Sequence, residues 1–187
     1  MLALQGDFAA HAEALTRSGA VPVYVREREQ LDGLDGLILP GGESTTMLKL
    51  LRYENLFDDL AEFGLRKPMF GTCAGAILMA RDVTHPAQES LGIMDIAVER
   101  NAYGRQLDSR VVKLDPALEF KERTGPGELE AVFIRAPIIR RAGSEVRVLA
   151  EYAGDPVLVE QGRHLASTFH PELTMDARVH SFFLTKL

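Results

Sequence analysis

The chain has 187 residues, a net charge of −6 and a single cysteine. This length suffices for a domain with a sizeable core, so a single domain over residues 1–187 is expected. The acidic balance argues against a general nucleic-acid-binding surface, and one cysteine excludes an internal disulfide. No segment has the pattern of a membrane span or a cleavable leader, so a cytoplasmic protein is expected.

The first half of the chain alternates short apolar strands with helices. Strands are predicted over residues 2–5, 21–25 and 34–39, and helices follow Gly6-Asp7 and cover about residues 45–52 and 54–65. Such a β-α-β-α order favours a parallel sheet covered by helices on both faces. The first strand begins without a lead-in, so we expect the natural start to lie upstream of Met1.

From Gly92 onward the pattern changes to strands with little helix between them. The predicted strands cover residues 93–99, 109–114, 129–134, 146–152, 157–161 and 165–169, and a closing helix covers residues 176–187. The sequence therefore predicts an α/β fold with a mainly parallel central sheet and an antiparallel portion in the second half.

The only cysteine lies in the segment Gly71-Thr72-Cys73-Ala74-Gly75, after the predicted strand at residues 68–70 and before a helix beginning near Ala76. A glycine on each side relieves crowding in such a tight turn, a nucleophile elbow. The thiol would then lie at a helix N-terminus, where the helix dipole favours the reactive thiolate. The alternative is a buried, inert core thiol, but the flanking glycines favour catalysis.

A cysteine nucleophile requires a base, and His170 is the strongest candidate. It follows the predicted strand at residues 165–169, and Pro171 stops that strand. Glu172 can accept the imidazole N–H, fix the tautomer and stabilise the imidazolium. The other histidines lie in predicted helices, a polar loop or a hairpin turn, without a carboxylate placed in this way: His11, His85, His164 and His180. His11 and His180 are expected at the surface or in packing contacts.

A second glycine loop, Pro40-Gly41-Gly42-Glu43-Ser44-Thr45-Thr46, follows the predicted strand at residues 34–39. It lacks the lysine of a phosphate-binding loop. One interpretation is a simple turn in which Ser44 or Thr45 caps the next helix.

An alternative interpretation of this loop comes from the cysteine. Acyl transfer through a thiol builds an oxyanion, which backbone N–H groups commonly stabilise. Ala74, after the nucleophile, offers one N–H group, and Gly42 could offer the other. Because sites in such sheets form at the carboxyl ends of strands, we expect the loop, Cys73 and His170 to meet at one edge.

Together these motifs resemble the class I, triad-type glutamine amidotransferases, and more narrowly the glutaminase subunit of pyridoxal 5′-phosphate synthase. The elbow and His-Pro-Glu are shared by all triad glutaminases, whereas Glu-Arg-Asn and Ile-Arg-Ala-Pro narrow the match. The matching segments run in order over essentially the whole chain: residues 4–8, 39–46, 70–75, 98–106, 132–137 and 167–173. The resemblance implies a flavodoxin-like, three-layer fold of the class I glutaminase type. The sequence departs from the family pattern only before Leu4, where the family carries a few more strand residues.

The resemblance also implies a reaction, the hydrolysis of L-glutamine to glutamate and ammonia. Ammonia would pass to a synthase subunit that builds pyridoxal 5′-phosphate (vitamin B6) from two sugar phosphates. Cys73 would be the nucleophile, His170 the acid and base, and Glu172 its orienting partner, while Gly42 and Ala74 would form the oxyanion hole. No cofactor and no metal are expected.

Glutamine is a zwitterion, so its α-carboxylate and α-ammonium groups need partners of opposite charge. Arg100 would bind the carboxylate bidentately, and Glu43 would bind the ammonium group. The resemblance places further residues at the substrate: Gly42, Ser44, Ile134 and Arg135. Ordinary surface charges are the alternative for Arg100 and Arg135.

Two other functions remain open. One is a stand-alone cysteine hydrolase of the same superfamily, such as a γ-glutamyl hydrolase or a peptidase. The other is a partner subunit that binds without catalysing, although a complete set of Cys73, His170 and Glu172 argues against it. Neither a nucleic acid nor a membrane is expected as a partner.

Overall fold

The computed structural model describes residues 1–102 and 109–187; residues 103–106 of the motif at 98–106 lie outside this range. The central sheet has the strand order β1-β2-β10-β9-β8. Its strands are β1 (Leu37–Leu39), β2 (Met69–Thr72), β8 (Arg147–Tyr152), β9 (Asp155–Gln161) and β10 (His164–Ser167). The first three strands in this order are parallel, and the last two pair antiparallel. The predicted α/β fold with its antiparallel portion in the second half is therefore confirmed.

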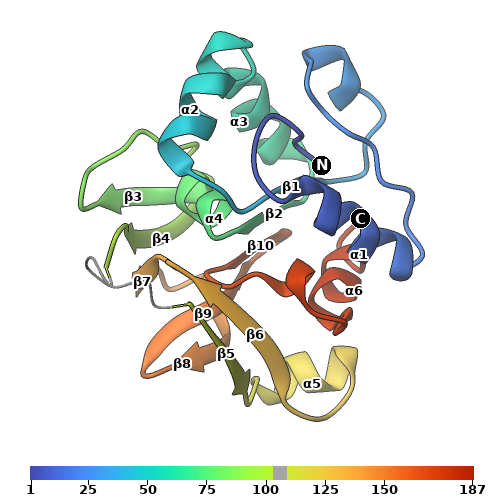
Figure 1. Cartoon of the computed structure of the whole chain (residues 1–187), viewed down its shortest axis with the longest axis vertical. Coiled ribbons are helices and arrows are strands. Elements are labelled where there is room, and N and C mark those ends of the chain that lie inside the picture. Colours follow the sequence, from blue (N-terminus) through green and yellow to red (C-terminus); the bar gives the residue numbers. More distant parts are fainter. Residues whose placement is uncertain (103–108) are drawn as a thin grey trace.

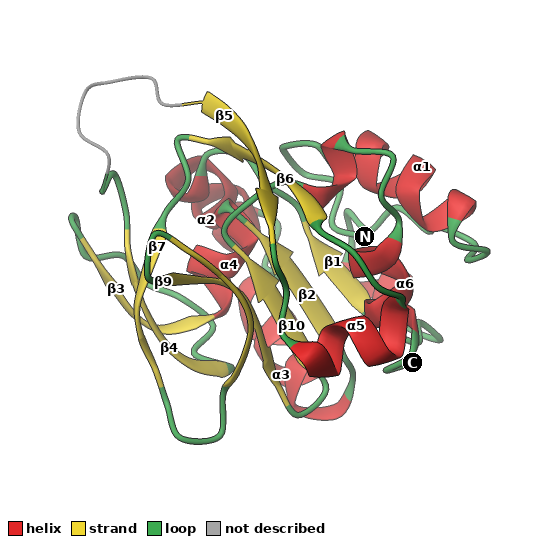
Figure 2. Ribbon diagram, turned by 90° about the horizontal axis from the view of Figure 1, so that it is seen from below, coloured by secondary structure: helices red, strands yellow, loops and turns green. Residues whose placement is uncertain are grey.

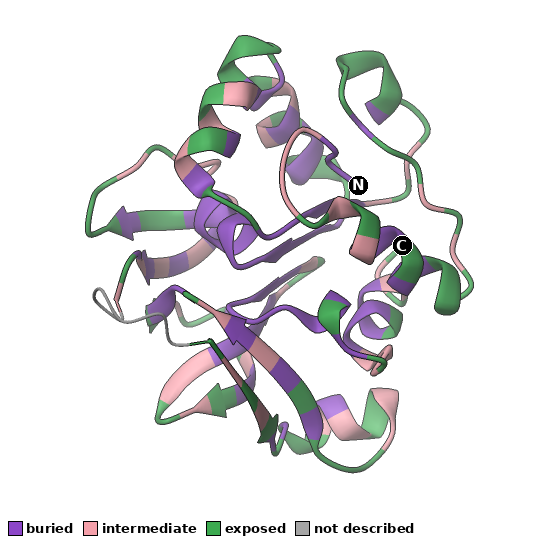
Figure 3. Cartoon of the chain, viewed as in Figure 1, coloured by how far each residue is buried: buried purple, intermediate pink, exposed green. Residues whose placement is uncertain are grey.

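Helices cover both faces of the parallel strands (Figure 1). One face carries α2 (Ser44–Tyr53), α3 (Phe57–Arg66) and α4 (Ala74–Met79), and the other carries α1 (Phe8–Arg17) and α6 (Arg178–Leu184). The strands between these layers are almost entirely buried (Figure 3). Fully buried side chains such as Leu39 and Phe70 form the core, because each face of the sheet is covered by an apolar helix face. In the described residues, no helix is long and apolar enough to cross a membrane.

The N-terminal residues extend the sheet beside β1. The backbone N–H of Leu2 donates to the Ile38 carbonyl at 2.9 Å, and that of Ala3 donates to the Val25 carbonyl at 2.8 Å. The predicted strand over residues 21–25 is wrong, because only the bridge between Leu2 and Val25 forms there. Val21 is 89% exposed and Pro22 has no N–H group, so the rest of this segment neither packs nor pairs as a strand.

The second half adds two small sheets beside the central one. β3 (Ala80–Thr84), β4 (Met94–Glu99) and β7 (Ile138–Ala142) form one, and β5 (Ser109–Leu114) pairs antiparallel with β6 (Leu129–Ile134) in the other. The sequence did not predict β3, β7 or the helix α5 (Leu118–Thr124). Only Phe120 of α5 is buried, and β3 has exposed charged residues at its centre, so neither shows a clear apolar pattern.

The register of the parallel strands brings three loops to one edge of the central sheet (Figure 2). Leu39 of β1 is opposite Gly71 of β2, and Ser167 of β10 is opposite Thr72. The chain therefore leaves all three strands at nearly the same level, just before the second glycine loop, Cys73 and the segment leading to His170. This placement confirms that the three segments meet at the carboxyl ends of the strands.

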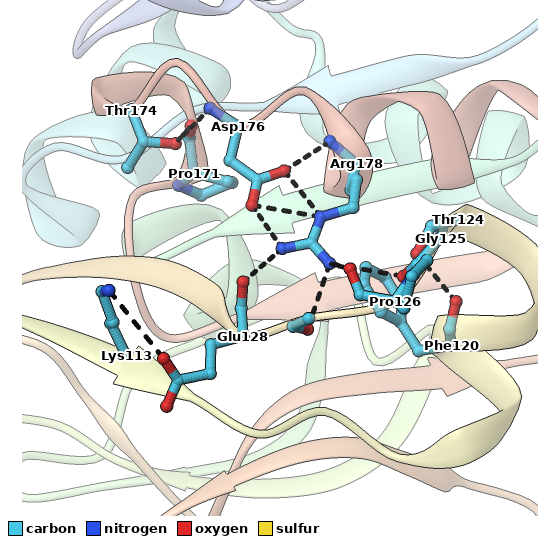
Figure 4. Close-up of polar contacts among 11 residues, drawn as sticks. Lys113, Phe120, Thr124, Gly125, Pro126, Glu128, Pro171, Thr174, Asp176 and Arg178 are labelled. Carbon is cyan, nitrogen blue, oxygen red and sulfur yellow. Dashed lines mark hydrogen bonds and ion pairs between the residues drawn. The ribbon is translucent and has the colours of Figure 1, made fainter.

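A guanidinium clasp fixes the segment between His170 and α6 (Figure 4). Arg178 binds both oxygens of the Asp176 carboxylate and donates to the backbone carbonyls of residues 125–128. The backbone N–H of Asp176 donates to Thr174 Oγ1 at 3.1 Å, and that hydroxyl donates to the Pro171 carbonyl at 3.1 Å. The clasp therefore ties the turn that carries Glu172 to the loop that precedes β6.

Candidate active site

Cys73 occupies a strained turn between β2 and α4. Its backbone has φ 48° and ψ −101°, a conformation that costs free energy for any residue with a Cβ. Its N–H donates to the Ser167 carbonyl at 2.9 Å, which holds the turn against the neighbouring strand end. The strained turn projects the thiol out of the regular strand and helix, as a nucleophile elbow requires.

The two glycines of the elbow are required by space. A Cβ on Gly71 would lie 2.5 Å from the carbonyl carbon of Gly75, and one on Gly75 would lie 2.0 Å from the Leu39 carbonyl oxygen. The prediction that these glycines relieve crowding is confirmed. They let α4 approach β1 and β2 closely. Since α4 has only six residues, its dipole is short, and a nearby base becomes the more important activator of the thiol.

His170 and Glu172 form a buried pair at the end of β10. His170 Nδ1 lies 2.7 Å from Glu172 Oε1, and both residues are 4% exposed. The His170 backbone N–H donates to the Val132 carbonyl at 2.8 Å, which fixes the backbone from which the imidazole projects. The imidazole also packs on the second glycine loop, because a Cβ on Gly41 would lie 2.4 Å from His170 Cε1. The ring is thus held from three sides.

The charge state of His170 follows from its two partners. Burial by itself lowers the pKa of His170, but its interactions with the Cys73 sulfur and the Glu172 carboxylate outweigh burial and raise the pKa to about 10. The imidazole therefore holds a proton at neutral pH. A protonated imidazole between a sulfur and a carboxylate is the arrangement that acyl transfer through a thiolate needs.

Asp7 adds a third group near this pair. Donor atoms of Asp7, His170 and Glu172 lie within 4.8 Å of one another, which is close enough to hold a metal ion. The imidazole nitrogen of His170 that faces Asp7 is Nδ1, which lies 3.9 Å from Asp7 Oδ2. The same nitrogen is already hydrogen-bonded to Glu172. The geometry therefore fits an oriented base better than a metal centre.

Glu43 caps α2. Its carboxylate accepts the backbone N–H groups of Thr45 at 3.1 Å and Thr46 at 2.7 Å. The prediction that Ser44 or Thr45 caps this helix is therefore wrong, because the longer Glu43 side chain reaches back to both N–H groups. Burial raises the pKa of Glu43, but these hydrogen bonds and that of the Thr46 hydroxyl outweigh it and lower the pKa to about 2. The carboxylate is thus ionised beside the loop.

The rest of the second glycine loop rests on residues 5–7. The strand predicted over residues 2–5 is wrong, because only Leu2 forms a bridge and the chain bends from Leu4 onward. The Gly41 carbonyl accepts the backbone N–H of Asp7 at 3.2 Å, and Gln5 Oε1 accepts that of Glu43 at 3.1 Å. Gly42 has φ 154°, and a Cβ there would lie 2.5 Å from Gln5 Oε1. The Gly42 peptide is therefore packed tightly against Gln5.

One pocket gathers the residues expected at the substrate. Its lining includes Cys73 and all six residues expected to bind glutamine, together with three that the sequence analysis missed: Gly42, Glu43, Ser44, Cys73, Ile77, Arg100, Asn101, Ile134, Arg135 and Pro137. Asn101 and Pro137 stand inside motifs already quoted for the resemblance. Ile77 lies one helical turn beyond Cys73, and that spacing could have identified it.

Arg100 and Arg135 differ in their surroundings. Arg100 is only 8% exposed, donates to Thr45 Oγ1 at 2.8 Å and lies 3.7 Å from Glu43 Oε1, so an ordinary surface charge is the wrong interpretation of it. Arg135 is exposed, with φ 44°, at the turn after β6. Ser44 donates its hydroxyl to Gln88 Oε1 at 3.1 Å, which orients the first residue of α2.

Two histidines outside the motifs lie beside this site. His11 of α1 and His180 of α6 are fully buried and joined by a 2.9 Å contact between ring nitrogens, so a surface position for either is excluded. His11 Nε2 lies 3.4 Å from Glu172 Oε2. The sequence analysis missed this proximity, because α1 and α6 are brought together only by the fold.

Known proteins resemble the chain over its whole length. The model of the SNO glutamine amidotransferase family matches residues 1–187. Pyridoxal 5′-phosphate synthase subunit PdxT of Solibacter usitatus is 73% identical, with 100% of this chain and 97% of that protein covered. The PdxT subunit of Thermotoga neapolitana is 49% identical, with 98% and 96% covered.

Solved structures of similar fold include another glutamine amidotransferase. A crystal structure described as a glutamine amidotransferase is 48% identical and superposes with a TM-score of 0.89, covering 99% of this chain and 96% of that chain. The structure of PurLQS from Thermotoga maritima is 18% identical with a TM-score of 0.66, covering 98% and 95%, and is similar in fold. The chain belongs to the SNO glutamine amidotransferase family.

Proposed function

We propose that the chain hydrolyses L-glutamine to glutamate and ammonia and delivers the ammonia to the synthase subunit of pyridoxal 5′-phosphate synthase. One observation supports the chemistry: His170 interacts with both the strained Cys73 and Glu172, beside a pocket lined by Arg100 and Glu43. The relatives named as subunits of that synthase, one of them 73% identical, carry the assignment of the partner.

The first half of the reaction forms a thioester. The Cys73 thiolate attacks the side-chain amide carbon of glutamine, and the carbonyl oxygen becomes an oxyanion. The N–H groups of Ala74 and Gly42 stabilise that charge. The His170 imidazolium, held by Glu172 at Nδ1, gives its other proton to the leaving nitrogen, which departs as ammonia.

The second half of the reaction restores the enzyme. Neutral His170 removes a proton from water, and the resulting hydroxide attacks the thioester carbon. The second oxyanion collapses with loss of the Cys73 thiolate, and glutamate leaves. Glu172 stabilises the imidazolium that forms again, so the charge distribution matches that at the start of the cycle.

Substrate recognition rests on the charges in the pocket. The guanidinium of Arg100 binds the α-carboxylate of glutamine, and its bond to Thr45 Oγ1 orients it. The ionised Glu43 binds the α-ammonium group while it caps α2. Ser44, Ile134 and Arg135 complete the contacts to the substrate.

The cytoplasm is the compartment that suits this chemistry. A lone catalytic thiol must stay reduced, and cytoplasmic glutathione and thioredoxin keep thiols reduced. Because Cys73 is the only cysteine, no second thiol in the chain could protect it as a disulfide.

Ammonia release from glutamine tests the assignment. The chain is assayed with its synthase subunit, as wild type, Cys73→Ala and His170→Asn. Wild type should release ammonia, and each variant should lose activity by at least about 1,000-fold, since residues that act as a unit fail together. An electrophilic glutamine analogue should modify Cys73 in the wild type, which mass spectrometry of the peptide would show.

The controls separate this function from its alternatives. Circular dichroism and thermal unfolding should show that Cys73→Ala keeps the fold, because the substitution removes little packing volume. Ammonia release by Cys73→Ala at the wild-type rate would contradict the mechanism. Cleavage of γ-glutamyl peptides in preference to glutamine would favour a stand-alone hydrolase instead.

A further inference from the structure

A buried pair of histidines lies directly behind the carboxylate of Glu172. His11 Nδ1 and His180 Nε2 are 2.9 Å apart, and His11 Nε2 lies 3.0 Å from Thr72 Oγ1 and 3.4 Å from Glu172 Oε2. All four side chains are buried, since their residues are between 0% and 4% exposed. α1, β2, α6 and the turn after β10 thus meet at one polar cluster inside the apolar core.

Two atoms of this cluster lack a hydrogen-bond partner among the described residues: Glu172 Oε2 and His180 Nδ1. An unpaired N–H group in the core costs more than an unpaired lone pair on an imidazole nitrogen, so His180 Nδ1 is best left without a proton. The proton of neutral His180 is then on Nε2, where it is donated to His11 Nδ1 at 2.9 Å.

That assignment fixes the proton of His11. Because His11 Nδ1 accepts from His180, neutral His11 carries its proton on Nε2, facing both Thr72 Oγ1 and Glu172 Oε2. The opposite arrangement would leave an N–H group of His180 unpaired and turn a bare nitrogen of His11 toward a carboxylate. Two separate electrostatic penalties therefore favour the same direction of donation.

We propose that His11 is a positioning residue of the catalytic site: its Nε2–H group, hydrogen-bonded to Thr72 Oγ1, also stabilises the outer oxygen of Glu172 electrostatically across 3.4 Å, while His180 fixes its tautomer. Glu172 then offers Oε1 to His170 Nδ1 at 2.7 Å. The order of donation is His180 to His11 and His11 to Thr72 Oγ1, with Glu172 Oε2 3.4 Å from the same His11 nitrogen, while His170 donates to the opposite oxygen of that carboxylate. This inference rests on the proposed function, since it concerns the orientation of the base in glutamine hydrolysis.

The surroundings keep the two histidines neutral. Burial lowers the pKa of His11 well below its usual value, and electrostatic interactions with His180, His170 and the N-terminal amine act in the same direction. Burial also lowers the pKa of His180 to about 4, with a smaller effect from Arg17. A neutral His11 can direct the positive end of its Nε2–H dipole toward Glu172 without neutralising the carboxylate charge that His170 needs.

Steady-state kinetics with the synthase subunit test the proposal. His11→Leu removes both ring nitrogens and should lower kcat by about 10–100-fold, as loss of a supporting partner does at other sites, with KM for glutamine within about 2-fold. His11→Gln keeps an amide N–H near the position of Nε2 and should recover most of that loss. Wild-type turnover in the same assay tests the proposed function by itself.

A double-mutant cycle separates positioning from simple packing. In a Glu172→Ala background there is no carboxylate to hold, so adding His11→Leu should change kcat by less than about 3-fold. Leu15→Ala is the matched control, because Leu15 is buried on the same helix and lies in the apolar core instead of this cluster. That control should lower the melting temperature while leaving kcat unchanged.

Two outcomes of these kinetic measurements would overturn the proposal. One is an equal loss of kcat from His11→Leu with and without the Glu172 carboxylate, and the other is no loss at all. Nitrogen-15 NMR of the wild-type chain labelled at histidine gives a test that no folding defect can affect. It should show His11 protonated at Nε2 and bare at Nδ1, and a proton on Nδ1 would refute the assignment.

Discussion

Several residues that line the pocket hold backbone conformations that are unfavourable for residues other than glycine. The φ angles are 48° at Cys73, 52° at Asn101 and 44° at Arg135. Each costs about 1–3 kcal/mol and persists only where the surrounding structure enforces it. At Cys73 this strain belongs to the turn that carries the thiol, so the fold accepts a local cost in stability to position that side chain.

The buried histidines predict how stability depends on pH. Below pH 6.5 the unfolded chain takes up protons on His11, His164 and His180, whereas the folded chain resists them because burial lowers all three pKa values. The unfolded state then binds more protons, so the free energy of unfolding falls as the pH falls from 6.5 toward 4. Each histidine contributes up to about 1.4 kcal/mol per pH unit.

Urea unfolding between pH 7 and pH 4.5 measures this dependence. His180→Leu removes one of these groups, so its stability should depend less steeply on pH than that of the wild type, by up to about 1.4 kcal/mol per unit. Equal slopes in the two proteins would contradict the burial of a neutral His180.

His170 affects stability in a higher pH range. Because its pKa is raised in the folded chain, its contribution to the free energy of unfolding is fully present below pH 6.5 and is lost as the pH rises toward about 10.

At the residue scale, the sequence predicts those site residues whose roles follow from neighbours within a few positions. Cys73 between two glycines, and His170 two residues before Glu172, are patterns within a few positions, and the structure brings these residues together. His11 could not be found this way, since its contact with Glu172 depends on how α1 packs against α6 and the turn after β10. The cap of α2 was assigned to the wrong residue, because Glu43 reaches the same N–H groups as a serine or threonine cap.

Among the elements, the clasp at the start of α6 offers a direct test. Arg178→Ala removes the guanidinium that donates to the Asp176 carboxylate and to the carbonyls of residues 125–128, and only the backbone N–H of residue 178 still donates to Asp176 Oδ1. Because hydrogen bonds to charged groups are the stronger ones, the free energy of unfolding should fall by about 1.5–3 kcal/mol in a urea titration. Arg178→Lys is the matched control and should recover only part of it, since an ammonium group lacks the planar fork. A change below about 0.5 kcal/mol for Arg178→Ala would show that the clasp does not stabilise the fold.

Helices and strands were predicted correctly where their apolar residues recur with the period of a helix or a strand. β5 and β6 have the predicted bounds, because alternating burial matches the strand period in the sequence. α5 was missed since it buries a single residue, and β7 was missed since arginines occupy much of it. The segment at residues 21–25 was overpredicted because valine and tyrosine favour strands even where, as here, the fold leaves them exposed.

For the whole molecule, the parallel strands determine where the chemistry occurs. β1, β2 and β10 end at one edge, so three segments far apart in the sequence supply the glycine loop, the proposed nucleophile and the proposed base. The order of strands and helices was enough to predict that edge. The small sheets, which carry Arg100 and Arg135 to the pocket, depend on contacts between distant segments that no local pattern encodes.

The transfer of nitrogen from glutamine to product tests the central claim most directly. The chain, as wild type or Cys73→Ala, is combined with the synthase subunit and its sugar phosphates, and nitrogen-15 is supplied as amide-labelled glutamine or as an ammonium salt. Mass spectrometry should find label in pyridoxal 5′-phosphate from either source with the wild type, but only from ammonium with Cys73→Ala. Label from glutamine in the Cys73→Ala complex, or none from glutamine in a wild-type complex that uses ammonium, would contradict the account.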